Sequence, residues 1–183
     1  MDAVDNEDKV KKTLKYADEL RYFADIIGER YDSKTVEVFR TVRTNPPTDE
    51  DLVPLQYQHA NSLEYYPLEI TQDVVDALSK DDKVKEVGHR SLSVNETCDK
   101  CIKEARRSFN SYVKKKNPTQ EAIEDYKKKR GVYVAKFMIT PELGIITNFH
   151  KSSKHAQVLL YDNVKIEDVW DAKTPVLSFK YEK

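Results

Sequence analysis

Residues 132–139 read VYVAKFMI, and this stretch decides the fold class. Its side chains follow a period of two, with Tyr133, Ala135, Phe137 and Ile139 alternating with the residues between them. Successive side chains of a β-strand point to opposite faces, so this period predicts a strand. Apolar residues occur in both sets, which indicates that both faces of the strand are covered.

The residues after this stretch predict further strands joined by short turns. A turn at 141–144 leads into a strand at 145–149, and the polar loop 150–154 leads into a strand at 156–161. One helical turn is expected at 165–171, and the alternation of Leu177, Phe179 and Tyr181 predicts a last strand. Because short turns join neighbouring strands in antiparallel order, the C-terminal third is expected to form an antiparallel β-meander.

Helical periods dominate the first two-thirds of the chain. Apolar residues three and four apart predict a helix that ends near Gly28: Val10, Leu14, Ala17, Leu20, Ala24 and Ile27. Ser93 and Glu96 have the spacing of a capping box, which predicts a helix from there to about Lys116.

A second capping box, Asn117 to Gln120, predicts the next helix. Pro118 is expected at its first position and Gly131 at its C-terminal stop. The two helices are then an antiparallel pair.

Shorter elements complete the α+β domain. A β-rich run at 35–44 ends at the prolines that follow Asn45, short helices are expected after Thr48 and Thr71, and a short strand is expected at 87–93. We find no linker or repeat, so residues 1–183 are expected to form a single domain, helix-rich in its first two-thirds, with 1–8 flexible.

Composition excludes some classes of protein. The chain has 31 Lys and Arg against 32 Asp and Glu, a net charge of -1, which argues against a general DNA-coating protein. Its apolar runs are far shorter than the roughly 20 residues that a membrane helix needs. The acidic start is unlike a secretory signal, so the chain is expected to be cytoplasmic.

Two cysteines, Cys98 and Cys101, have the spacing of half a zinc knuckle or of a redox motif. The histidines outside this pair lack regular ligand spacing, and no second such pair occurs. Cys98 belongs to the apolar stripe of its helix. We therefore interpret both cysteines as inert thiols in or near the core, and no metal is expected.

Arg40 and His155 are the candidate catalytic residues. Burying an arginine on a valine-rich strand costs free energy unless the arginine is paired or binds a phosphate or carboxylate. An edge strand that leaves Arg40 in water explains the presence of this residue equally. His155 follows a loop rich in hydroxyl and ammonium groups, a composition suited to anion binding or proton transfer and equally to a polar hairpin loop.

The segment 88–93 reads GHRSLS and is expected to end a strand at a helix N-terminus, where backbone amides form an anion site. Ser93 is assigned to capping, which leaves His89 and Ser91 as candidate cofactor-binding residues.

Two lysine-rich groups close the two paired helices, one from Lys114 to Lys116 and one from Lys127 to Arg130. Cations at a helix C-terminus complement the macrodipole, which explains both groups. The alternative is an RNA-binding patch on the helical pair.

The order of an Arg-bearing strand, the GHRSLS segment and the later strands resembles the ADP-ribosyltransferase-like superfamily and its RES-type relatives, often bacterial toxins. The resemblance implies that Arg40 and Ser91 hold a nicotinamide dinucleotide (NAD), as part of a bacterial conflict or toxin–antitoxin system. The late strand carries Gln157 where relatives usually have a Glu that activates the acceptor. His155 is then expected to act as acid, base or acceptor-positioning group.

A rival hypothesis is a non-enzymatic interaction module of the adaptor, antitoxin or immunity type. Its contact surface would be the segment 57–66, which holds Tyr57, Tyr65 and Tyr66 and is punctuated by proline nearby. Binding of a protein partner or of a second copy of the chain is expected under this hypothesis.

Overall fold

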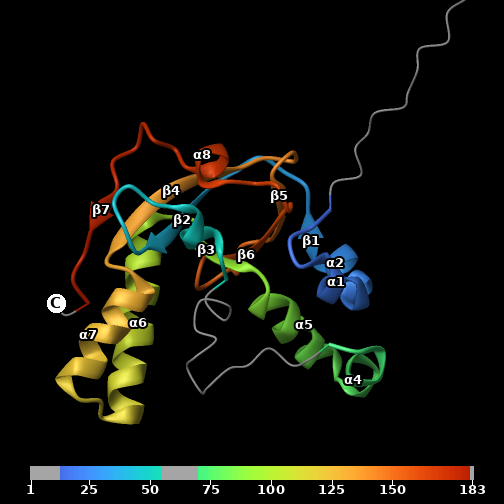
Figure 1. Cartoon of the computed structure of the whole chain (residues 1–183), viewed down its shortest axis with the longest axis horizontal. Helices are drawn as coiled ribbons and strands as arrows, with labels where there is room; N and C mark the ends of the chain where they lie inside the picture. Colours follow the sequence, from blue (N-terminus) through green and yellow to red (C-terminus); the bar gives the residue numbers. More distant parts are fainter. Residues whose placement is uncertain (1–12, 55–69, 182–183) are drawn as a thin grey trace, which may run out of the picture.

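The computed structural model describes residues 13–54 and 70–181. Within them, seven strands form one antiparallel sheet in the order β1-β5-β6-β3-β2-β4-β7 (Figure 1). The strands are β1 (Tyr31–Asp32), β2 (Val36–Val42), β3 (Leu92–Asn95), β4 (Tyr133–Ile139), β5 (Gly144–Thr147), β6 (His155–Leu160) and β7 (Leu177–Ser178).

The helices are α1 (Ala17–Leu20), η1 (Arg21–Phe23), α2 (Ala24–Arg30), η2 (Asp49–Leu52), α4 (Gln72–Ala77), α5 (Lys80–His89), α6 (Cys98–Lys116), α7 (Gln120–Arg130) and α8 (Ile166–Val169). None of the helices in the described ranges has the length and apolar character that crossing a membrane requires.

The α+β class is confirmed. The longest strand pairing joins β2 to β4, from Val36↔Ile139 to Val42↔Tyr133. β5 and β6 are consecutive neighbours as expected, but β2 and β3 insert between β6 and β4. The C-terminal strands therefore flank a centre that comes from earlier in the chain.

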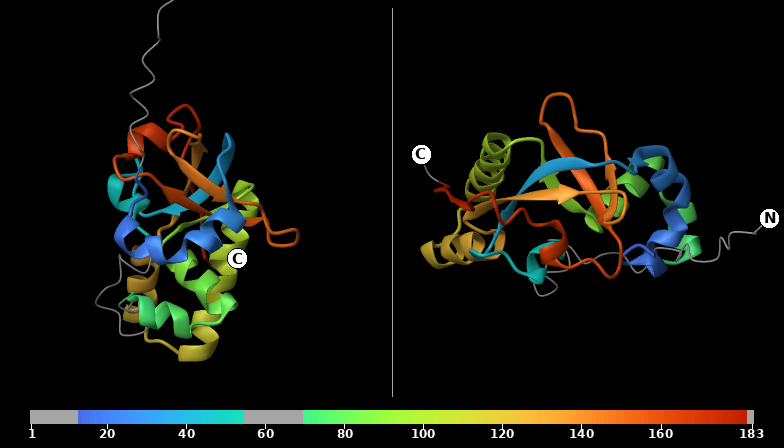
Figure 2. Two further views of the ribbon diagram at one scale, coloured as in Figure 1. Left: turned by 90° about the vertical axis from the view of Figure 1, so that its right-hand side faces the viewer. Right: turned by 90° about the horizontal axis from the view of Figure 1, so that it is seen from above.

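The core lies in two clusters. Valines of β2 pack with Leu52 of η2 and Val169 of α8 on one face of the sheet. Leu20, Phe23 and Ile26 pack with α4, α5 and β6 in the second cluster. α6 lies across β2, β3 and β4 on the face opposite to α8 (Figures 1 and 2).

The helix predicted up to Gly28 is interrupted. A 3-10 segment, η1, separates α1 from α2, and residues 10–12 lie outside the described residues. Side chains three apart lie on the same face of a 3-10 helix, so the buried set is Leu20, Phe23 and Ile26. Phe23, expected off the apolar stripe, is fully buried, and Ala24, expected on it, is exposed.

The capping box at Ser93 is wrong. Ser93 lies inside β3, and Thr97 caps α6, where its side chain accepts a hydrogen bond from the Lys100 amide. The strand predicted at 87–93 is also displaced, because α5 continues to His89 and the strand begins at Leu92. Pairing of β3 with β6 outweighs the local capping signal.

The remaining helix boundaries follow the sequence signals more closely. Thr48 and Thr71 cap η2 and α4, and α6 ends at Lys116. α7 is capped by Thr119 rather than begun by Pro118, and Gly131 follows its last residue.

Gly131 and Gly28 give opposite predictions for alanine substitution. Gly131 has φ 87° and ψ 153°, and a Cβ there would overlap the Val42 carbonyl. Gly131→Ala is expected to lower the free energy of unfolding by at least about 1–3 kcal/mol from backbone strain alone. Gly28 lies inside α2 with nothing near a Cβ, so Gly28→Ala is expected to raise it by about 0.5–1 kcal/mol. Urea unfolding of both variants measures the two changes in the free energy of unfolding. Equal changes in the two variants would contradict the prediction.

Candidate functional site

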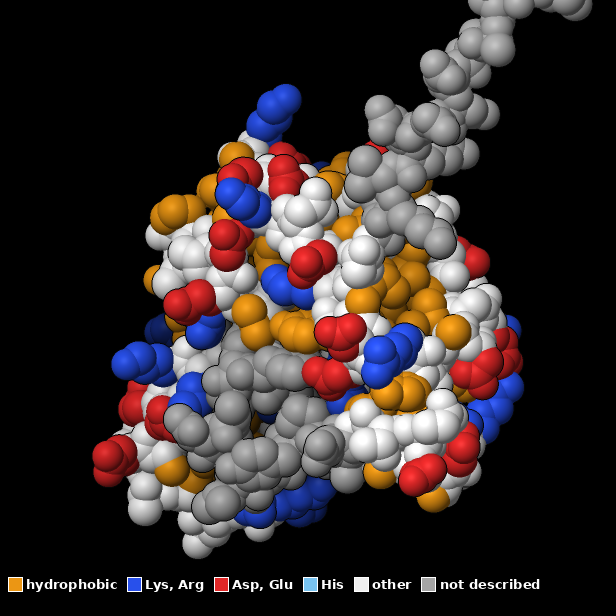
Figure 3. Space-filling model, turned by 45° about the vertical axis from the view of Figure 1, so that its right-hand side comes forward, with side chains coloured by type: hydrophobic (Ala, Val, Ile, Leu, Met, Phe, Trp, Pro, Cys, Tyr) orange, Lys and Arg blue, Asp and Glu red, His pale blue; other side chains and the backbone are white. Residues whose placement is uncertain are grey.

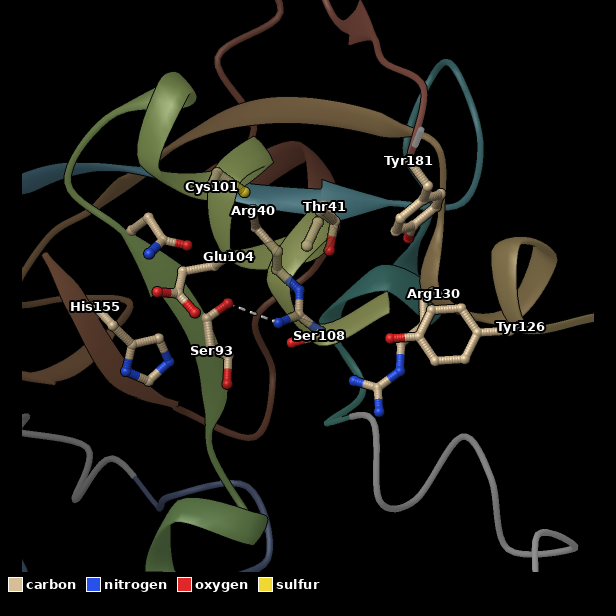
Figure 4. Close-up of a pocket in the computed structure, with 12 residues that line it drawn as sticks. Arg40, Thr41, Ser93, Cys101, Glu104, Ser108, Tyr126, Arg130, His155 and Tyr181 are labelled. Carbon is tan, nitrogen blue, oxygen red and sulfur yellow. Dashed lines mark hydrogen bonds between the residues drawn. The ribbon is translucent and has the colours of Figure 1, made fainter. Parts of the chain in front are cut away.

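A cleft of about 160 Å³ opens between α6, α7 and the centre of the sheet. Figure 4 shows its side chains converging from strands and helices that are far apart in the sequence. It is lined by Arg40, Thr41, Ser93, Asn95, Cys101, Glu104, Ala105, Ser108, Tyr126, Arg130, His155 and Tyr181.

The cleft lies where the short pairing between β2 and β3 ends. Within the described residues, Phe39↔Asn95 is the register pair between these strands. Ser93 and Asn95 lie two apart on β3 and line the cleft, while Leu92 and Val94 belong to the apolar core. The alternation along β3 therefore places one polar face toward α6.

Arg40 is a buried cation whose guanidinium is held by backbone carbonyls. Its Nε donates to the Asp51 carbonyl at 3.0 Å, Nη1 to the Ser93 carbonyl at 2.9 Å, and Nη2 to the Val53 carbonyl at 3.4 Å. No carboxylate among residues 13–54 and 70–181 forms an ion pair with it. A guanidinium has five N–H donors, so these bonds leave donors for another acceptor.

Burial lowers the pKa of Arg40 to about 10, and the nearby Asp51 opposes that effect. The Asp51 carboxylate itself accepts hydrogen bonds from the backbone amides of Thr48 and Arg43. These two amides already bind the Asp51 carboxylate, so Asp51 does not neutralise Arg40 alone. The positive charge of Arg40 therefore stays available to an anion in the cleft.

Asn95 contributes a donor without an acceptor. Only 5% of its surface is exposed, and its Nδ2 is buried with no hydrogen-bond partner among residues 13–54 and 70–181. An unsatisfied buried amide costs about 1–3 kcal/mol, so a ligand that supplied an acceptor would recover part of that free energy.

His155 lies opposite Asn95 at the start of β6. Burial lowers the pKa of His155, and the carboxylate of Glu104 acts in the opposite direction. Glu104 also pairs with Arg107 at 2.7 Å. Figure 4 shows Glu104 between the imidazole of His155 and the centre of the cleft.

The structure brings two of the four candidate residues to this cleft, Arg40 and His155. Ser91 is buried, and its hydroxyl donates to the Gly88 carbonyl. His89 lies at the end of α5, with its Nδ1 3.5 Å from Glu86. Because a helix C-terminus, not an N-terminus, adjoins the segment 88–93, the backbone anion site expected there is wrong.

Several lining residues did not stand out in the sequence, although two patterns contain them. Ser93 and Asn95 alternate with apolar residues in period two. Cys101, Glu104 and Ser108 lie three and four apart along one face of α6. Arg130 was considered only as one of a lysine-rich group.

The cysteines lie at the start of α6. Cys101 is buried at the cleft, and burial raises the pKa of its thiol to about 12. Burial also raises the pKa of Cys98. Both shifts disfavour the thiolate that metal binding and redox exchange need. Across 13–54 and 70–181, we find no group of three or more His, Cys, Asp or Glu side chains that could hold a metal ion.

No family model, curated protein or solved structure matches this chain.

Proposed function

We propose that this chain binds a nicotinamide nucleotide in the cleft, as an ADP-ribosyltransferase-like domain. The observation that carries the proposal is the buried guanidinium of Arg40, which has spare donors and no carboxylate partner among the described residues. Charge-assisted bonds from an arginine to phosphate are among the strongest in proteins. In this proposal Arg40 and Arg130 hold the pyrophosphate.

The polar residues around Arg40 suit the other parts of such a ligand. Ser93 and Asn95, whose buried Nδ2 lacks an acceptor among the described residues, line the same cleft. A carboxamide oxygen or a ribose hydroxyl is a suitable acceptor for that amide. Ser93 thus takes the role that the resemblance gave to Ser91.

The size of the cleft limits how much of the ligand it holds. Sites for whole drug-sized ligands are about 300–1,000 Å³, and this cleft is about 160 Å³. The cleft can hold one end of a dinucleotide, and the rest of the ligand extends out of the cleft past Arg130. A neighbouring groove shares Ser108, Tyr126 and Arg130 with the cleft.

The proposed function is binding, because the expected strand carboxylate is missing. Gln157 does not line the cleft, and its side-chain oxygen accepts a hydrogen bond from Tyr31 at 3.2 Å. Glu104 is the carboxylate on the cleft wall, and it and His155 are the acid–base candidates. A role in bacterial conflict stays a prediction from the resemblance.

For the rival interaction module, the described residues 13–54 and 70–181 supply no observation, because they do not include its contact surface. Its contact segment, 57–66, lies outside the described residues.

Thermal unfolding with millimolar NAD tests the proposal. A ligand at 100 times its Kd stabilises the folded state by about 2.7 kcal/mol. For a domain of this size that corresponds to a rise in Tm of roughly 5–10 °C. Arg130→Gln is expected to reduce the rise, because it removes one cation from the cleft.

Lys129→Gln is the matched control. It makes the same change in charge one residue away, but Lys129 pairs with Asp125 at 2.7 Å and lines a different hollow. No rise with NAD, or an equal loss in both variants, would contradict the proposal.

A further inference from the structure

A second concave surface, which we term the α6–α7 groove, lies between the two paired helices. Its volume is about 590 Å³. Figures 1 and 2 show α6 and α7 side by side, away from the helices of the second core cluster. It is lined by Arg107, Ser108, Ser111, Tyr112, Lys115, Lys116, Tyr126 and Arg130.

The helix connection explains why these residues meet. α6 ends at Lys116, its C-cap Asn117 has φ 43°, and α7 begins after the cap at Thr119. The tight reversal makes the helices antiparallel, so Lys116 at one helix end and Arg130 at the other lie along a single groove. Lys116 is nine positions beyond Arg107 in α6, which corresponds to a length of about 14 Å along the helix.

The groove is basic although the whole chain is nearly neutral. Its lining residues carry four cationic side chains and no carboxylate. Two acidic residues of α7 are engaged elsewhere, with Glu124 paired to Lys127 at 3.3 Å and Asp125 to Lys129 at 2.7 Å. Of the four cations, Arg107 pairs with Glu104 of α6 at 2.7 Å. On the face seen in Figure 3, by contrast, acidic and basic side chains are interspersed.

Two stacked tyrosines form part of the groove wall. The rings of Tyr112 and Tyr126 are 4.6 Å apart with an interplanar angle of 20°. The Arg130 guanidinium lies over the Tyr126 ring at 5.5 Å. Exposed aromatic faces beside cations are the features by which proteins bind unpaired bases and their phosphates.

We propose that the α6–α7 groove binds single-stranded nucleic acid. Its cations contact successive phosphates, and Tyr112 offers a ring face on which a base stacks. An unpaired base can enter a concave groove of this size, whereas the bases of a duplex are already stacked and paired. The groove adjoins the proposed nucleotide site and shares Ser108, Tyr126 and Arg130 with it, but Arg40, Asn95 and His155 do not line the groove.

The first test is fluorescence anisotropy with labelled single-stranded RNA and DNA oligonucleotides. With four phosphates neutralised, the affinity is expected to fall about 50-fold between 50 and 200 mM salt. Lys115→Gln/Lys116→Gln is expected to lower the slope of log K against log salt by about 1.4, because two cations are lost.

Lys128→Gln/Lys129→Gln is the matched control. It removes the same charge from the C-terminal end of α7, but both lysines line the hollow beside Arg43 and Glu50. Binding and salt slope are expected to stay unchanged. Equal losses in the two double variants would show non-specific attraction and overturn the proposal, as would no binding of either oligonucleotide at 50 mM salt.

The second test separates stacking from charge. Tyr112→Ala is expected to weaken binding about 5- to 100-fold, which corresponds to the roughly 1–3 kcal/mol of one base stacked on an aromatic ring. Tyr112→Phe keeps the ring and is expected to bind like the unaltered chain. Equal affinity in both variants would overturn the stacking role.

NAD binding by the same variants distinguishes the two proposals. Under this inference, Lys115→Gln/Lys116→Gln leaves the NAD-induced rise in Tm unchanged. If that variant lost the rise while oligonucleotide binding was unaffected, the groove would be the outer part of the nucleotide site, and the inference would be overturned. If NAD failed to bind while the oligonucleotide results held, the proposed function alone would fail.

Discussion

Arg90→Met is expected to lower the free energy of unfolding by about 3–5 kcal/mol, because it leaves the buried carboxylate of Glu86 and the half-buried carboxylate of Glu19 without their cation. The Arg90 side chain is 0% exposed. Its Nε donates to Glu19 at 2.7 Å, and its Nη1 donates to the Glu86 carboxylate at 2.8 Å. These bonds tie the end of α5 to α1.

Urea unfolding measures this effect, with Arg30→Met as the control. Arg30 is exposed at the end of α2, and its replacement is expected to change stability by no more than about 0.5 kcal/mol. Replacing Arg90, Glu86 and Glu19 together by apolar residues is expected to restore part of the loss, since no unpaired charge is then buried. A loss below about 1 kcal/mol for Arg90→Met would contradict a stabilising role for this ion cluster.

Arg90 also shows why the sequence misled at the segment 88–93. Seen alone, the segment offers a glycine, a histidine, an arginine and two serines, which is a typical anion-binding composition. The carboxylates of Glu86 and Glu19 accept hydrogen bonds from Arg90, and Glu19 lies 71 positions away in the sequence. Such long-range pairing has no signal in a single sequence.

Elements with strong local periods were predicted well. β2 and β4 coincide with runs of apolar and β-branched residues. η2 and α4 begin after a capping threonine, and α7 ends before Gly131. α6 was given the wrong start because Ser93 and Glu96 match a capping box locally. Long-range pairing with β6 decides that Ser93 belongs to a strand.

The candidate site was predicted only in part for the same reason. Arg40 and His155 were selected by chemistry alone, and the sheet brings their strands close together through β3. Within the segment 88–93, the serine that lines the cleft is Ser93 and not Ser91, because β3 begins later than predicted. Asn95 has no signal in the sequence, because its buried amide without an acceptor among the described residues is a property of the folded chain.

Arg40 has a structural role as well as the proposed ligand role. Arg40→Lys keeps the charge, but one ammonium cannot reproduce the planar fork that reaches three carbonyls. We expect a loss of stability of at least about 1–3 kcal/mol from the carbonyls left unsatisfied. If Arg40 also contacts the phosphates, NAD affinity in the folded protein is expected to fall about 10- to 100-fold, the equivalent of one charge-assisted hydrogen bond.

Val38→Ala separates the two roles of Arg40. Val38 is fully buried on the same strand and the same face as Arg40, so its truncation destabilises the sheet without changing charge. Calorimetric titration with NAD, at a temperature where both variants are folded, is expected to show weakened binding for Arg40→Lys and unchanged binding for Val38→Ala. If Arg40→Lys bound NAD with unchanged affinity, Arg40 would be a structural brace between β2, β3 and η2, and the anion in the cleft would depend on Arg130 alone.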